Sequence, residues 1–364
     1  MKKYRYLSWF AVLIMFFSLG FPNITFSRPY YQGKTLTIVV PHAPGGGTDI
    51  FARLIARYLP RYIPGEPTII IRNMPGGMTN IGGNYVYLTA KRDGLTVLAG
   101  SGASAMNSFL RTKGTRFSYD DMPLIMGTPT GDIFYTRPDL CSKPEDIVKV
   151  GQNLVFGHSP PPYSTTTAFL LGREVLGFKT KKDVLAFHSG ADTRRAFLTG
   201  EIDIGGESTM GYAKAVYPLV KKGEVTSLWQ TGIYDPEKGI VRQGGVTTDV
   251  PLTNEVYERI YGKVPSGPAC DALEAYVAYI KGITKVLLFP PGTEKYATIV
   301  RKAAMKMEQD VGFQKDANKM FLGAPIYTGE GAVKIMEYAA TKAEASRSWI
   351  QEWLHKGWGV EFEK

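Results

Sequence analysis

The sequence predicts a two-lobed α/β protein in which each lobe is a mostly parallel sheet flanked by helices. Short β-branched segments alternate with amphipathic helical segments, Gly-rich turns follow the strands, and the pattern starts twice along 364 residues. A chain of this length has room for about two domains. Its 44% hydrophobic and 21% charged residues are typical of a globular protein and exclude a disordered chain.

The first 27 residues are typical of a secretory signal peptide. Three basic residues precede an uncharged apolar run from Leu7 to Phe21, and the segment 25–27 (TFS) supplies a small-x-small cleavage site. We expect cleavage near Ser27 and a periplasmic protein; the alternative is an uncleaved membrane anchor. No second apolar run of about 20 residues follows, which excludes a channel or a polytopic transporter.

The charge of the chain limits the kinds of partner that it can bind, and its two cysteines allow one disulfide at most. The formal charge is +10, but the basic residues are spread along the chain and match no nucleic-acid motif, so we expect no nucleic-acid partner. A basic exported protein suits a small anionic ligand. Cys141 and Cys270 form one disulfide if they are close in an oxidising compartment, and otherwise remain two free thiols.

The first α/β pattern follows the signal segment. The β-branched run 35–40 (TLTIVV) predicts a strand, and residues 48–58 place five apolar side chains, beginning with Ile50, on one helical face. Strands at 68–71 and 95–99 follow, each with a Gly-rich turn and a helix behind it. This repetition predicts parallel pairing.

The pattern starts again at residue 153. In order, the sequence predicts a strand at 153–156, a helix at 165–176, a strand at 183–187, a helix at 193–198, a strand at 202–204, a helix at 210–222 and a strand at 225–230. A loop rich in Gly, Thr and Pro spans 234–251. The last third is mainly helical, with helices at 294–309, 313–321 and 331–355.

Two such units predict two lobes that close about a hinge on a ligand. We place lobe 1 at residues 28–132 plus 234–364 and lobe 2 at residues 133–233. The segments 132–137 and 227–233 are expected to cross between them. Ligands of open parallel sheets bind beyond the carboxyl ends of the strands, so the turns at those ends are the candidate site.

The first turn, residues 41–49 (PHAPGGGTD), combines three glycines with a helix N-terminus. Such a turn directs N–H groups and partial positive charge at a carboxylate or phosphate; the alternative is a plain tight turn. Thr48 is the expected N-cap. Neither a P-loop nor a GxGxxG pattern is present. The candidate ligand-binding residues are His42, Ala43, Pro44, Gly45, Gly46, Gly47, Thr48 and Asp49.

The second turn (residues 73–83) and the third turn (residues 100–104) repeat this composition after the next two strands. Together the three turns put N–H groups and hydroxyls on one edge of one sheet, which predicts an anion site with no metal and no cofactor. The candidates in these two turns are Gly76, Gly77, Asn80, Gly82, Ser101 and Ser104.

Several segments resemble one protein family. PHAPGGGTDIFARLIARYL resembles the PFAPGGxxD segment of periplasmic solute-binding receptors of the tripartite tricarboxylate transporter system, the TctC-like or Bug family. RNMPGGMTNIGG resembles that family's NRPGAGGxIG, and KRDGLTVLAG its ADGYTLLxG. Looser matches follow in the same order at FHSGADTRRAFLTGEIDI, TTDVPLTNEVYE and LFPPGTEKYATIVRKA. The resemblance runs from about residue 34 to the C-terminus.

The resemblance implies a type II-like periplasmic binding protein of the Venus-flytrap kind, without catalytic activity. Such a receptor, a monomer, captures a small organic anion between its lobes and delivers it to a membrane permease of one large and one small subunit. One ligand carboxylate is held by turns corresponding to 43–49 and 76–83, through backbone N–H groups and water. The second lobe reads the other end of the ligand.

The second lobe departs from the family pattern. Where the family has GSxGxGS, residues 157–165 contain three prolines, which remove N–H donors; this loop either offers hydroxyls to a ligand or is purely structural. Arg194 suits a second carboxylate or is solvated, and Glu207 suits a ligand amine or hydroxyl or caps a helix. The candidates here are His158, Ser159, Ser164, Thr165, His188, Ser189, Gly190, Arg194 and Glu207.

Three histidines, His42, His158 and His188, each follow a predicted strand. They bind a multiply charged anion or a transition metal if they converge, and are separate turn residues otherwise. Two other functions stay open. One is a ligand-presenting sensor subunit for a membrane signalling protein. The other is an exported hydrolase using Ser101 and a histidine, although GxSxG and HExxH motifs are absent.

Overall fold

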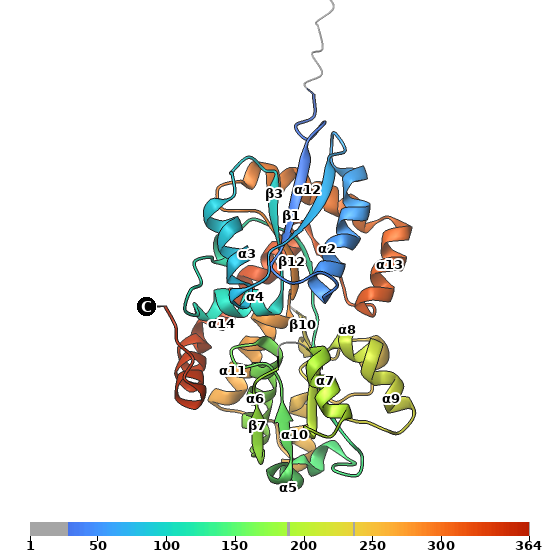
Figure 1. Cartoon of the computed structure of the whole chain (residues 1–364), viewed down its shortest axis with the longest axis vertical. Coiled ribbons are helices and arrows are strands. Elements are labelled where there is room, and N and C mark those ends of the chain that lie inside the picture. Colours follow the sequence, from blue (N-terminus) through green and yellow to red (C-terminus); the bar gives the residue numbers. More distant parts are fainter. Residues whose placement is uncertain (1–27, 188–189, 236, 364) are drawn as a thin grey trace, which may run out of the picture.

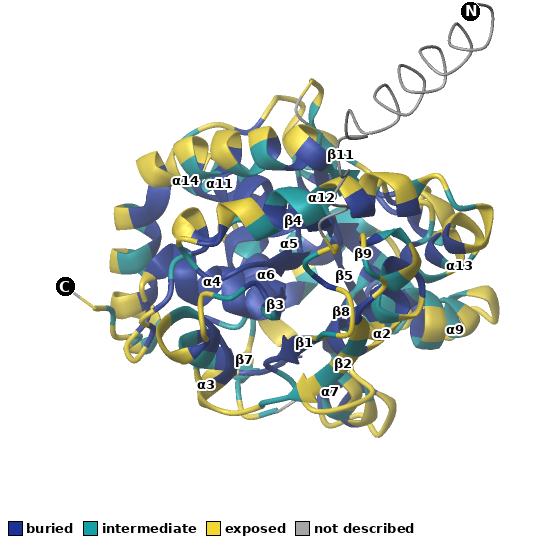
Figure 2. Cartoon of the chain, turned by 90° about the horizontal axis from the view of Figure 1, so that it is seen from above, coloured by how far each residue is buried: buried dark blue, intermediate teal, exposed yellow. Residues whose placement is uncertain are grey.

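The computed structural model describes residues 28–187, 190–235 and 237–363. The predicted signal peptide and two site candidates, His188 and Ser189, lie outside them. Two mixed sheets with flanking helices occupy the two ends of the long axis (Figure 1). Seen from above, buried strands are enclosed by helices whose outer faces are exposed (Figure 2). The predicted two-lobed α/β fold is confirmed.

The six-stranded sheet has the order β13-β4-β12-β3-β1-β2. The strands that the sequence identified, β2, β1 and β3, are parallel neighbours, as predicted. The sheet as a whole is mixed, because β12 and β13 return from the C-terminal third and pair antiparallel. The strands are β1 (Thr35–Val40), β2 (Thr68–Asn73), β3 (Thr96–Gly100), β4 (Leu124–Thr128), β12 (Lys285–Leu288) and β13 (Tyr327–Thr328).

The five-stranded sheet has the order β7-β6-β8-β5-β9. Here β6 is parallel to β7 and β8, whereas β5 is antiparallel to β8 and β9. A separate hairpin pairs β10 with β11. The strands are β5 (Asp132–Thr136), β6 (Val155–Gly157), β7 (Lys182–Val184), β8 (Ile204–Ser208), β9 (Thr226–Gln230), β10 (Ile233–Asp235) and β11 (Gly239–Val241).

Amphipathic helices cover both sheets. Helix α2 buries Phe51, Leu54, Ile55 and Tyr58, as its periodicity predicts, but Ile50 is exposed. The helices are α2 (Gly47–Tyr58), α3 (Asn80–Asn84), α4 (Gly102–Leu110), α5 (Ile147–Val150), α6 (Ser164–Leu176), α7 (Gly190–Leu198), α8 (Thr209–Gly211), α9 (Tyr217–Lys221), α10 (Thr253–Tyr261), α11 (Pro268–Tyr276), α12 (Glu294–Glu308), α13 (Val311–Phe321) and α14 (Gly329–Trp358). Short π-helical segments extend three of them: η3 (Tyr85–Thr89), η7 (Tyr212–Val216) and η9 (Val277–Lys281).

The contacts of the helices that follow the β10–β11 hairpin indicate to which lobe each of these helices belongs. Both α10 and α11 pack against α6, and α14 packs along α11 and reaches β4. These contacts favour placing residues 253–276 with the second sheet. The boundaries given above, 28–132 plus 234–364 and 133–233, stay a prediction.

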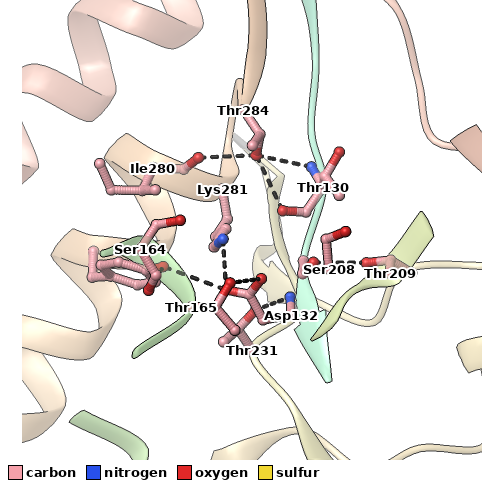
Figure 3. Close-up of polar contacts among 12 residues, drawn as sticks. Thr130, Asp132, Ser164, Thr165, Ser208, Thr209, Thr231, Ile280, Lys281 and Thr284 are labelled. Atoms are coloured by element: carbon pink, nitrogen blue, oxygen red, sulfur yellow. Dashed lines mark hydrogen bonds and ion pairs between the residues drawn. The ribbon is translucent and has the colours of Figure 1, made fainter. Parts of the chain in front are cut away.

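A buried polar cluster lies where the chain passes between the sheets, at the position predicted for the hinge. The carboxylate of Asp132 accepts hydrogen bonds from Lys281 Nζ (2.6 Å) and Thr165 Oγ1 (3.1 Å), and its amide donates to Thr231 Oγ1 (2.9 Å). Figure 3 shows these side chains converging from β5, η9, α6 and the link after β9. Asp132 and Lys281 are almost fully buried, so this cluster is built around one enclosed ion pair.

The two cysteines are free thiols in this structure. Cys141 Sγ donates to the carbonyl of Lys143 (3.1 Å), and burial raises the pKa of this thiol to about 11. The disulfide alternative is therefore not formed. Among the helices that the structure describes, none combines the length and the hydrophobicity needed to cross a bilayer.

Candidate functional site

The first turn is closed by Asp49, which is buried. Its carboxylate accepts hydrogen bonds from Gly45 N (2.9 Å), Arg53 Nε (2.8 Å) and Asn73 Nδ2 (2.9 Å). The bond to Arg53 is the main cause that lowers the pKa of Asp49 to about 2. Gly45 has a positive φ of 83°, which favours glycine there. Asp49 thus shapes the turn, and its charge is balanced within the protein.

The N-terminus of α2 differs from the prediction. Gly46, and not Thr48, is the N-cap, and no side chain caps the helix. Thr48 is the second helical residue, and its hydroxyl accepts a hydrogen bond from Lys285 Nζ (3.1 Å). The first amide groups of a helix have no intrahelical partner, so an uncapped N-terminus leaves them free to bind an anion.

The structure brings the three turns together. Asn73, the last residue of β2, donates to the carbonyl of His42 (3.0 Å), and His42 Nε2 lies 2.8 Å from Ser101 Oγ. Ser101 and Ser104 form the capping box that begins α4. The turns meet because β2, β1 and β3 are parallel neighbours, whose carboxyl ends lie on one edge.

Residues of the second turn mainly position the backbone. Gly76 and Gly77 have positive φ values. A Cβ on Gly82 would lie 2.9 Å from Pro41 Cβ, so glycine lets α3 approach the first turn. Asn80 Oδ1 accepts a hydrogen bond from Thr115 Oγ1 (3.0 Å), which engages this side chain with a different loop.

The proline-containing loop of the second lobe is tightly held. His158 is buried, its Nδ1 lies 3.1 Å from Thr166 Oγ1, and its amide donates to the carbonyl of Val184 (3.1 Å). Thr166 Oγ1 also donates to the carbonyl of Ser159 (2.6 Å). These contacts support the structural interpretation of the loop. The Ser159 hydroxyl is buried and has no partner in the described part of the chain.

The start of α6 faces the first lobe. Ser164 Oγ lies 3.1 Å from the point that a Cβ on Gly102 would occupy, so the N-termini of α6 and α4 approach each other. Thr165, the next residue, donates to Asp132 in the hinge. Of these two candidates, Ser164 is the one placed against the turns of the first lobe.

Arg194 and Glu207 form an ion pair with each other. Glu207 is buried, and desolvation raises the pKa of its carboxyl group, an effect that Arg194 opposes. The helix after Glu207 is capped by Ser208, which accepts from Gly211 N (3.4 Å). A Cβ on Gly190 would lie 2.8 Å from the Glu207 carboxylate, so α7 begins against this ion pair.

The predicted convergence of three histidines stays a prediction, since His188 lies outside the described residues. His42 bonds to Ser101, whereas His158 bonds to Thr166. Within residues 28–187, 190–235 and 237–363, no three His, Cys, Asp or Glu side chains gather as metal ligands would. Burial lowers the pKa of His42 and of His158 to about 4, so both are neutral near pH 7.

Burial of His158 predicts loss of stability in acid. Its pKa is about 4 in the folded state and about 6.5 when unfolded, so the unfolded chain binds more protons between these values. The free energy of unfolding therefore falls as pH drops from about 6.5 toward 4, by about 1.4 kcal/mol per pH unit for this residue. Urea unfolding at several pH values should give a shallower slope for His158→Gln; an unchanged slope would contradict the assignment.

Two candidate functional residues, Lys281 and Lys285, belong to no recognisable sequence motif. Lys281 is paired with Asp132, and Lys285 contacts Thr48 of the first turn although the two residues are 237 positions apart in sequence. The one available signal is a lysine at the start of the apolar strand Lys285–Leu288. Strand periodicity alone does not say which turn such a side chain will contact.

The fold and sequence can be compared with those of known proteins. No protein-family model matches the sequence, and neither does any curated protein. Solved structures do match. A TctC solute-binding protein from Polaromonas is 17% identical, with a TM-score of 0.62 over 90% of this chain and 99% of that one. MatC of Rhodopseudomonas palustris with bound malate is 20% identical, with a TM-score of 0.58 over 88% and 98%.

Another R. palustris protein, solved with adipate, is 18% identical, with a TM-score of 0.63 over 90% of this chain and 98% of that one. The chain has the fold of periplasmic solute-binding proteins. This confirms the fold that the resemblance predicted. The first and third turns meet at His42 and Ser101, and Ser164 lies against Gly102 at the start of α4.

Proposed function

We propose that this protein is an extracytoplasmic solute-binding receptor. It captures a small organic anion with a carboxylate group between its two lobes, by hinged closure, and has no catalytic activity. It belongs, in this proposal, with the TctC-like or Bug receptors and delivers its ligand to a tripartite tricarboxylate-type transporter with one large and one small membrane subunit. It acts as a periplasmic monomer.

The observation that carries this proposal is the uncapped N-terminus of α2 with Lys285 beside it. Free amide groups, a helix dipole and an ammonium group all favour negative charge at one place. His42 and Ser101 add neutral hydrogen-bonding groups next to it. A carboxylate satisfies this set, because it accepts several hydrogen bonds and carries one charge.

One observation favours a second function, the exported hydrolase. His42 Nε2 lies 2.8 Å from Ser101 Oγ, a distance suited to activating a nucleophile. However, a general base works best with a pKa near the operating pH, and the pKa of His42 is about 4. Ser101 Oγ also accepts from Ser104 N (3.3 Å) as the cap of α4. We therefore favour ligand binding for this pair.

Thermal unfolding against a ligand panel tests the receptor proposal. The panel holds malate, adipate, aromatic acids and amino acids, with uncharged sugars as controls. A ligand at 100 times its Kd stabilises the folded state by about 2.7 kcal/mol, and thus raises Tm by roughly 5 °C or more. We expect such a shift with one class of carboxylate and none with the sugars.

A ligand retained from the producing cells would mask the shift, so the protein is first unfolded, dialysed and refolded. Absence of a shift with every carboxylate after this step would contradict the receptor proposal.

A further inference from the structure

Lys285 brings an ammonium group to the first turn from a distant part of the sequence. It is the first residue of β12, and its Nζ donates to Thr48 Oγ1 at 3.1 Å. The same Nζ lies 3.9 Å from the point that a Cβ on Gly47 would occupy. The ammonium therefore sits beside the first turn of α2, where the helix already contributes partial positive charge.

Lys285 differs from Lys281 and Arg194, two other cations with buried carboxylate neighbours, in its partners. Lys281 is paired with Asp132, and Arg194 with Glu207. None of the ion pairs formed by the described residues includes Lys285, whose bonded partner is the neutral hydroxyl of Thr48. Enclosed charges in proteins are nearly always paired. An enclosed ammonium without a carboxylate thus indicates an anionic partner from outside the protein.

Lys285 is still accessible to such a partner. Its side chain is enclosed enough that burial lowers its pKa, yet the residue keeps partial exposure to solvent, as do His42 and Gly47 in the turn it contacts. Its carboxyl-side neighbours in β12 are buried. Lys285 and the turn that its ammonium group contacts are therefore both partly open to solvent, as access by a small ligand requires.

We propose that Lys285 binds the ligand carboxylate directly, through a charge-assisted hydrogen bond beside the first amide groups of α2. This inference rests on the proposed function and deepens it, because it names the group that recognises negative charge. A site with a lysine counter-ion selects an acid over its amide or ester, which keep the shape and lose the charge. Amide groups and water alone discriminate less strongly between them.

The groups around Lys285 determine how this bond depends on pH. Burial, and then repulsion from Lys281, lower the pKa of Lys285 to about 8, whereas Asp132 opposes the shift. His42 is neutral near pH 7. Lys285 is therefore charged below pH 8 and loses its proton above it. Ligand affinity should fall as pH rises past about 8, and binding there should take up a proton.

Lys285→Met tests the proposal. Affinities for acetate, benzoate, malate and adipate are measured by calorimetry on the purified protein at pH 7. We expect a loss of about 10- to 100-fold relative to wild type for the probes that bind. The matched control is Lys302→Met in α12, which removes one exposed lysine and should leave affinity unchanged. Above about pH 8, wild-type affinity should fall about tenfold per pH unit, and that of Lys285→Met should stay level.

Equal affinities and equal pH profiles for wild type and Lys285→Met overturn the role of Lys285 and leave the receptor proposal standing. If wild type binds neither these four acids nor any other acid of the thermal-unfolding panel, both proposals are overturned. If Lys285→Met fails to fold, two measurements on the wild-type protein still test the role of Lys285. Equal affinity for benzoate and benzamide, or a flat pH profile, then overturns the proposal.

Discussion

Lys281→Met is expected to lower the free energy of unfolding by about 3–5 kcal/mol, because it leaves the Asp132 carboxylate enclosed without a counter-ion. Both side chains of this pair are at most 2% exposed, with Nζ and Oδ2 2.6 Å apart. Thr165 and Tyr276 can still donate to Asp132, but neither supplies positive charge. Urea unfolding measures the loss.

Two controls separate the buried pair from general effects of the substitution. Asp132→Asn combined with Lys281→Met removes both charges, and most of the lost stability should return. Lys113→Met breaks an exposed pair of the same 2.6 Å length with Glu361 and should leave the unfolding midpoint nearly unchanged. If the double variant is no more stable than Lys281→Met, the charge of Asp132 is not the cause.

Because the Asp132–Lys281 pair lies at the predicted hinge, the substitution of Lys281 should also affect how the elements around the hinge are held. Asp132, at the start of β5, contacts α6, η9 and the link after β9. The pair thus fixes the elements about which the lobes are proposed to close. A buried ion pair is a weak source of net stability, and we infer that this pair instead fixes the geometry of the predicted hinge.

Gly46→Asp is expected to lower affinity for a carboxylate ligand by about 100-fold or more, without lowering stability. Gly46 is the N-cap of α2, with a φ of −76° that any residue adopts. A Cβ there has Ala43 O as its nearest neighbour, at 3.6 Å, so the side chain fits. An aspartate at an N-cap accepts the first amide hydrogen bonds and adds a like charge against the ligand.

Controls distinguish charge from occupation of the amide groups. Gly46→Asn caps the helix without a charge, so it should lose less affinity than Gly46→Asp. Gly331→Asp makes the same chemical change at a position in α14 with no atom near its Cβ, and should bind as wild type does. Calorimetry with the strongest acid of the panel provides the comparison. Full affinity in Gly46→Asp would remove the first turn from the site.

Local sequence patterns determined most of the elements. The strand at 35–40 and the helix over 48–58 were predictable because β-branched runs and helical spacing of apolar residues depend on neighbours in the chain. The parallel pairing of the first three strands followed from the helices between them. Since those strands lie side by side, the meeting of the three turns at one edge was also predictable.

What the sequence left open depends on residues far apart in the chain. β12 is short and pairs antiparallel with β3 and β4, so it does not belong to the repeated strand–helix pattern that predicted strands elsewhere in the chain. Arg194 and Glu207 each looked available for a ligand, and the fold pairs them with each other. Thr48 looked like the N-cap of α2, whereas the N-cap is Gly46, two residues earlier, and no side chain caps the first amide groups.

The sequence by itself therefore determined the two-lobed α/β fold and the Gly-rich turns at one sheet edge that we propose as the anion site, because spacing and glycine content are local properties. Only the tertiary structure decided which charges are balanced. Asp49 is paired with Arg53 and Lys281 with Asp132, whereas Lys285 forms no ion pair with a carboxylate of the described residues. A charge becomes a binding determinant when packing encloses it without a partner, and packing is a property of the whole fold.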